Sequence, residues 1–145
     1  MKFNSQIATT IEQSKRLLEL GLNPDTADLV YSNASLPYDK DVFQLVCRDY
    51  HALNESVNFE ISPFTFIPAW SLHRLIDLCT EYINIDGYQD TTYWFTMHKL
   101  DNKIIYENDY NRWLYLGDGD NLFDTLIDCI DWLIKEGKFN TEYLK

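Results

Sequence analysis

The stretch richest in ionisable side chains reads GDGDNLFDTLIDCID, residues 117–131, and holds five aspartates without a basic residue. A calcium loop of the helix-loop-helix type needs oxygen ligands at alternate positions, a glycine at its sixth position and a glutamate at its twelfth. Counted from Asp118, the fifth, sixth and twelfth positions hold Leu122, Phe123 and Cys129. The spacing therefore disfavours a calcium loop, and we expect no metal site.

Helical spacing gives a better account of these aspartates. At about 100° per residue, four of them fall within about 80° on one side of a helix, and apolar residues cover the other side. We therefore expect an amphipathic helix over residues 120–136, ended by Gly137. The acidic side is either a solvated face or a surface for a basic partner. The candidate partner-binding residues on it are Asp120, Asp124, Asp128 and Asp131.

Two other pairs have spacings that could carry chemistry. His73 and Asp77 lie one helical turn apart, so the carboxylate could orient the imidazole for acid–base catalysis; the alternative is an ordinary surface pair. Cys47 and His51 would share a face of a strand, but two ligands do not make a metal site. The glycine-rich, hydrolase and metalloprotease motifs are absent. We nominate no catalytic residue and expect no cofactor.

The third candidate feature is a concentration of aromatic residues. Residues 88–115 hold eight of the 22 aromatic side chains of the chain. The pattern predicts three consecutive antiparallel strands over 91–98, 104–107 and 112–116, with a tight turn at Asp101–Asn102.

Alternation along the first of these strands separates its side chains into two sets. Tyr93, Phe95 and Met97 would lie on one face of the sheet, and Trp94, Thr96 and His98 on the other. The aromatic residues either fill a core between sheet and helices or leave the Trp94 face as a contact surface. Trp94 and Trp113 are therefore further candidate partner-binding residues.

The remaining elements follow from capping and turn signals. A helix over 10–20 begins with a capping box, Thr9 with Glu12 or Thr10 with Gln13, and ends at Gly21. Asn23 and Pro24 then start a second helix over PDTADLVYS. This pair could be a DNA-binding helix-turn-helix or a plain helical hairpin, and its acidic second helix favours the hairpin.

Beyond this hairpin we expect a loop over 33–41, strands over 42–50 and 57–61, and an irregular segment over 62–70. A helix over 71–84 follows, capped by Ser71. Nothing marks a domain boundary. The sequence predicts a single α+β domain over 1–145, with a small antiparallel sheet and helices packed mainly on one face.

Composition narrows the class of protein. The chain has 145 residues, 46% of them apolar, and a net charge of −11. The charge disfavours nucleic acid and anionic membranes as direct partners. The N-terminus lacks the pattern of a signal peptide, and three widely spaced cysteines suit a reducing compartment. We expect a cytoplasmic protein.

Three blocks of the chain resemble a known group of proteins. TTIEQSKRLLELGLNPDTADLVYSN (9–33), IPAWSLHRLIDLC (67–79) and DNLFDTLIDCIDWLIKEGKFNTE (120–142) are similar to small proteins of unknown function from gut bacteria of the Bacteroides type. Members of that group are carried on prophages and other mobile elements. The resemblance implies a cytoplasmic bacterial setting and a phage-accessory role, and transfers no catalytic residue.

The sequence leads to one principal functional hypothesis and two alternatives. The principal hypothesis is a non-enzymatic phage or mobile-element accessory protein that acts by binding another protein, with a homodimer left open. The first alternative is a small enzyme or ligand-binding protein that uses His73, Asp77 and the aromatic strands. The second is an acidic inhibitor that mimics DNA through the aspartate side of residues 120–136.

Overall fold

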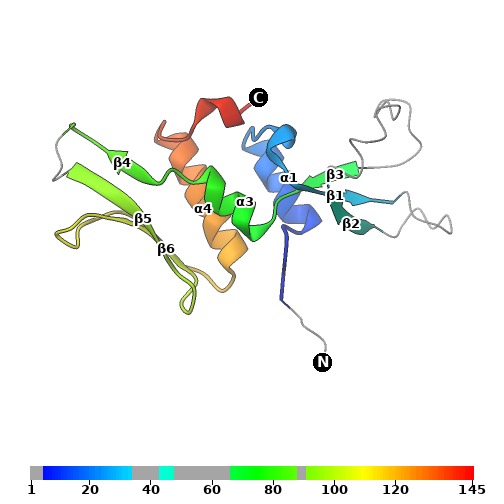
Figure 1. Cartoon of the computed structure of the whole chain (residues 1–145), viewed down its shortest axis with the longest axis horizontal. Coiled ribbons are helices and arrows are strands. Elements are labelled where there is room, and N and C mark those ends of the chain that lie inside the picture. The colour runs from blue at the N-terminus through cyan, green and yellow to red at the C-terminus, as the bar shows by residue number, and fades with distance from the viewer. Residues whose placement is uncertain (1–4, 34–42, 48–65, 88–90) are drawn as a thin grey trace. The chain divides into compact units, whose positions relative to one another are not determined.

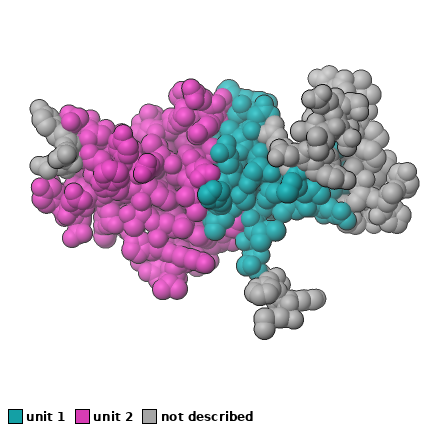
Figure 2. All heavy atoms as spheres, in the orientation of Figure 1, with its two compact units in different colours: residues 1–74, 145 teal, residues 75–144 magenta. Residues whose placement is uncertain are grey.

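A computed structural model describes residues 5–33, 43–47, 66–87 and 91–145 (Figure 1). As predicted, the fold is α+β: the described residues form three α-helices and seven strands in antiparallel sheets. The chain divides into two compact units, residues 1–74 with Lys145, and residues 75–144 (Figure 2). Each unit holds its own sheet, so there are two sheets where the sequence indicated one. That the whole chain is a single domain stays a prediction.

The first unit opens with helix α1 (Ile11–Glu19), which the capping signal located correctly. The Thr10 side chain accepts a hydrogen bond from the Gln13 backbone N–H at 3.2 Å, and the Gln13 side chain accepts one from the Thr10 N–H at 2.9 Å. The capping box is therefore the Thr10–Gln13 alternative. Gly21 follows the helix at φ 90°, the left-handed conformation expected there.

The predicted second helix is wrong. Asn23 does cap a turn, by accepting a hydrogen bond from the Asp25 N–H at 3.0 Å, but this turn is one 3₁₀ turn, Pro24–Thr26. The chain then enters strand β1 (Leu29–Ser32), because the β-branched Val30 and its neighbours alternate in burial and pair with strands on both sides. Because a 3₁₀ turn and a strand replace the second helix, the helix-turn-helix interpretation is also wrong.

Strand β1 is the centre of a three-stranded sheet ordered β2-β1-β3. Strand β2 (Gln44–Cys47) confirms part of the predicted strand over 42–50. Strand β3 (Phe66–Ala69) lies where an irregular segment was predicted, so that prediction is wrong. Its Pro68 is compatible with a strand because β3 is an edge strand among the described strands, and edge strands are where proline is found in sheets. The predictions for 34–41 and 57–61, and His51, lie outside the described residues.

Trp70 anchors the core of the first unit and is fully buried. Its indole N–H donates to the Thr26 hydroxyl at 3.0 Å, and its backbone N–H donates to the Thr9 hydroxyl at 3.0 Å. The Thr9 hydroxyl also lies 2.8 Å from that of Ser14 on α1. These bonds satisfy buried polar groups and fasten the end of β3 to the turn and the helix.

Helix α3 (Leu72–Leu78) is shorter than predicted. Ser71 begins it as expected, since its hydroxyl accepts a hydrogen bond from the Arg74 N–H at 3.1 Å. The helix stops at Leu78, whereas the prediction continued to residue 84. Tyr82–Asn84 instead forms strand β4, because Tyr82 and Ile83 suit a strand and pair with strand β5 (Thr92–His98).

The second unit holds a four-stranded antiparallel sheet ordered β4-β5-β6-β7. Its further strands are β5 (Thr92–His98), β6 (Lys103–Glu107) and β7 (Trp113–Gly117). These confirm the three predicted strands, and Asn102 at φ 51° supplies the left-handed residue of the turn. Helix α4 (Leu122–Lys135) packs against β6 and β7 (Figure 1).

Helix α4 confirms the amphipathic pattern. The Asn121 side chain caps it by accepting a hydrogen bond from the Phe123 N–H at 2.7 Å, and Gly137 follows it at φ 65°. Its buried apolar side chains are Phe123, Leu126, Ile127, Cys129, Ile130 and Leu133. No helix in the described part of the chain combines the length and apolar character needed to cross a membrane.

Candidate functional site

The four-stranded sheet of the second unit has one face covered by α4. On this inner face the ring of Tyr106 lies 5.7 Å from that of Phe95 and 5.9 Å from that of Trp132 on α4, between centroids. Tyr115 packs on the same Trp132 ring at 4.7 Å. Much of the aromatic block therefore fills a core between sheet and helix, as one of the two interpretations expected.

The outer face carries a row of side chains that crosses all four strands. The strand register places Tyr82 opposite Trp94, Trp94 opposite Glu107, and Glu107 opposite Trp113. Paired residues of adjacent strands project to the same face. We call Tyr82, Trp94, Glu107 and Trp113 the aromatic row.

The rings of the aromatic row are open to solvent. Tyr82, Trp94 and Trp113 are 50%, 46% and 59% exposed. Tyr82 and Trp94 touch, with ring centroids 5.4 Å apart. Large apolar side chains are usually exposed singly, so three aromatic rings in one row are the kind of surface that marks a contact site.

A β-bulge turns Trp113 outward. Tyr106 pairs with Tyr115 and Glu107 pairs with Trp113, so Leu114 is an extra residue on β7. Without it, simple alternation would place Trp113 on the same face as Tyr115. The bulge lets Tyr115 enter the core while Trp113 joins the aromatic row.

The next row of the outer face holds one exposed apolar side chain. Leu116 is 43% exposed and lies opposite Ile105, which is only 6% exposed. Ile105 in turn lies opposite Thr96 on β5. The next row thus adds only Leu116 to the exposed apolar surface, and toward the β5–β6 turn His98 lies opposite Lys103.

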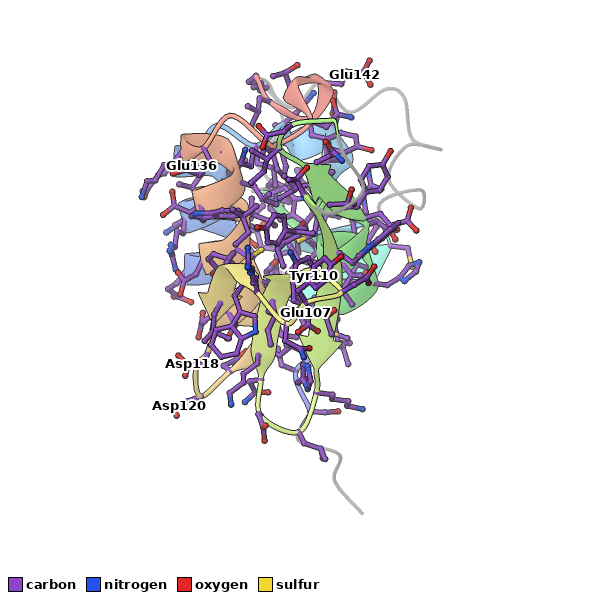
Figure 3. All side chains as sticks on the ribbon, turned by 90° about the vertical axis from the view of Figure 1, so that its left-hand side faces the viewer. Glu107, Tyr110, Asp118, Asp120, Glu136 and Glu142 are labelled. Atoms are coloured by element: carbon purple, nitrogen blue, oxygen red, sulfur yellow. The ribbon has the colours of Figure 1, made fainter. Side chains whose placement is uncertain are left out.

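The second unit is strongly acidic, and Glu107 stands inside the aromatic row. Residues 75–144 contain fourteen acidic and five basic residues, a net charge of −9 out of −11 for the chain. Figure 3 looks onto the sheet and shows Glu107 on β6, with Asp118 and Asp120 at the edge that leads into α4. Glu107 is half-buried. The aromatic row therefore lies on a strongly acidic unit.

The predicted aspartates do not join this face. Asp120 precedes α4, and its backbone carbonyl accepts a hydrogen bond from the Asn102 side chain at 3.0 Å. Asp124 and Asp128 are exposed on α4. Asp131 is only 19% exposed and bonds to Lys135 at 2.8 Å. The acidic side is therefore shorter than expected, and of the predicted residues only Trp94 and Trp113 belong to the aromatic row.

The other candidate residues lie elsewhere. His73 and Asp77 are both exposed on α3. Cys47 is exposed, whereas Cys79 and Cys129 are buried with their thiols hydrogen-bonded to each other. This hydrogen bond and burial raise the pKa of Cys129 above its ordinary value. Within the described ranges, no three His, Cys, Asp or Glu side chains are grouped so that they could hold a metal ion.

Sequence reasoning missed two members of the aromatic row. Tyr82 was assigned to a helix, and Glu107 has no local signal because its place depends on pairing with β5 and β7. A Tyr-Ile pair beyond the helix could have revealed β4 as a strand.

No protein-family model matches the chain, and searches of curated proteins and of solved structures return no significant match.

Proposed function

We propose that this chain is a non-enzymatic module that binds another protein through the outer face of its four-stranded sheet. The observation that carries the proposal is the aromatic row, three exposed rings aligned across four strands. Tyrosine and tryptophan are enriched at binding hot spots because they bury a large area with few rotatable bonds.

Charge indicates the chemistry of the partner. A net charge of −9 on the second unit attracts a basic surface and repels another acidic one. A second copy of this chain is a poorer occupant, because an isologous contact centred on the row would bring two Glu107 carboxylates together. We therefore propose a basic protein segment rather than a homodimer.

The biological setting rests on sequence resemblance. The similarity to small prophage and mobile-element proteins supports an accessory role in which this module binds a host or phage protein. Binding another protein requires a contact surface and no catalytic group, which agrees with a candidate site built from aromatic rings and one carboxylate.

A displayed library of random 15-residue peptides tests the proposal. We expect the selected peptides to be rich in arginine, lysine and aromatic residues, and to lose at least tenfold in affinity when Trp94 is changed to Ala. Leu100→Ala is the matched control, since Leu100 is 99% exposed at the β5–β6 turn, outside the row. Peptides that bind Trp94→Ala as tightly as wild type would contradict the proposal.

A further inference from the structure

We infer that Glu107, with Trp94 on one side and Trp113 on the other, forms a subsite for the guanidinium group of an arginine side chain in the partner. This inference rests on the proposed function and names the chemical group that the outer face recognises. No other feature of the described chain places a carboxylate between two exposed indoles.

The strand register sets the size of this subsite. Glu107 is the pairing partner of both Trp94 and Trp113, so the two tryptophans stand two strands apart. Neighbouring strands are about 4.8 Å apart, which separates the two backbones by about 10 Å. A flat group stacked between two rings needs about 7 Å, twice a carbon–carbon contact of about 3.5 Å. Two indoles that stand upright on these strands would therefore leave room for one planar group over Glu107.

The chemistry of the three side chains selects a planar cation. A guanidinium stacks on indole faces and also donates paired hydrogen bonds to a carboxylate. A lysine ammonium carries the same charge but is not planar, so it cannot stack between the two indoles as a guanidinium can. A neutral sugar would stack on the indoles but would gain little from a carboxylate charge at the centre of the row.

Glu107 is available for such a contact. Within the described part of the chain, no ion pair joins it to a basic side chain. Lys103, the nearest basic residue of the same strand, lies 3.8 Å from Asp101 at the turn. The half-buried position of Glu107 between two indoles removes part of its water shell, which strengthens its attraction for a cation.

Titration of the ¹⁵N-labelled full chain with the peptide Gly-Ser-Arg-Ser-Gly, followed by NMR, tests the inference. We expect the indole N–H signals of Trp94 and Trp113 to shift, and those of Trp70 and Trp132 to stay. Replacing the peptide arginine by citrulline, which keeps the plane and removes the charge, should weaken binding at least tenfold, and lysine should weaken it severalfold.

Two variants of the protein complete the test. Glu107→Gln should weaken binding of the arginine peptide at least tenfold, whereas Glu136→Gln, which removes the same charge beyond the end of α4 (Figure 3), should change it less than twofold. An unchanged amide spectrum and melting temperature would show that Glu107→Gln is folded. Any of three results would overturn the inference. The two variants bind the arginine peptide equally well, the citrulline peptide binds as tightly as the arginine peptide, or cellopentaose alone shifts the indole signals.

The two proposals fail in different ways. If library peptides bind through Trp94 but neither Glu107→Gln nor citrulline changes their affinity, the arginine subsite is wrong and the protein-binding face stands. If Trp94→Ala has no effect on the selected peptides, the proposed function itself is wrong.

Discussion

The rings of Tyr115 and Trp132 lie 4.7 Å apart between centroids, at an interplanar angle of 30°. Two residues before Tyr115 in the same strand, Trp113 faces the other side of the sheet and is 59% exposed. Strand β7 therefore contributes one aromatic ring to the core and another to the open face. Stability and binding should respond separately to changes at the two faces.

Trp132→Ala should destabilise the protein by about 2–4 kcal/mol, because it removes the ring that covers Tyr106 and Tyr115. Trp113→Ala should change the free energy of unfolding by no more than about 0.5 kcal/mol, as for other surface positions. Chemical denaturation monitored by circular dichroism measures both. A Trp113→Ala variant as unstable as Trp132→Ala would mean that the outer face is packed against something in the folded chain.

The three cysteines should react at very different rates. Cys47 is exposed, whereas Cys129 is fully buried and its hydrogen bond to Cys79, together with burial, raises its pKa. A thiol must ionise to react, so Ellman's reagent at pH 8 should label one cysteine per folded chain and three in denaturant. Cys47→Ser should abolish the fast label. More than one fast thiol in that variant would contradict the burial of the pair.

Alkaline pH should destabilise the fold. Burial raises the pKa of Tyr106 and Tyr115 above the ordinary 10.0, and the hydrogen bond to Cys79 and burial raise that of Cys129 above 9.0. The unfolded chain then releases protons that the folded chain retains, so stability is complete below about pH 9 and falls above it. Each group contributes up to about 1.4 kcal/mol per pH unit.

Urea denaturation at pH 8, 9, 10 and 11 measures this loss. The control is Tyr106→Phe, which keeps the ring and removes the hydroxyl that donates to the Thr80 carbonyl at 2.6 Å. Its stability should fall less steeply with pH than that of the wild type. Equal slopes would show that Tyr106 ionises as readily in the folded state as in the unfolded chain.

The cap of α4 gives a local test of the fold. Asn121→Ala removes the acceptor for the Phe123 N–H and should cost about 1 kcal/mol. Asn121→Asp keeps the acceptor and adds a charge that favours the helix N-terminus, so its stability should match or exceed that of the wild type. Thermal unfolding compares the three proteins. Equal losses in both variants would indicate that the Asn121 amide group, rather than the cap, is needed.

Features encoded by local sequence were predictable. The Thr10–Gln13 capping box, the Asn102 turn and the helix before Gly137 depend on residues within a few positions of one another. The errors share a different cause. Pro24 signals a helix start, but the residues after Thr26 gain more by pairing with β2 and β3 than by continuing a helix, and only the folded sheet offers those partners.

The aromatic row shows the same limit at the candidate site. Alternation correctly separated Trp94 from Phe95, because both belong to one regular strand. Alternation could not place Trp113 beside Glu107. The extra residue, Leu114, moves the side chain that precedes it on β7 to the opposite face of the sheet. A bulge depends on cross-strand register, which one sequence does not reveal.

The contact between Tyr82 and Trp94 leads to the last prediction. Their rings lie 5.4 Å apart, and such a pair contributes about 0.5–1.5 kcal/mol beyond simple burial. Tyr82 should therefore act as a positioning residue that holds the Trp94 indole ready for the partner. Tyr82→Ala should weaken binding of the selected peptides about threefold to tenfold by raising the dissociation rate, while Tyr82→Phe should bind as the wild type does. Biolayer interferometry separates the two rates. If Tyr82→Phe lost as much affinity as Tyr82→Ala, the tyrosine hydroxyl would be contacting the partner directly, and the positioning role would be wrong.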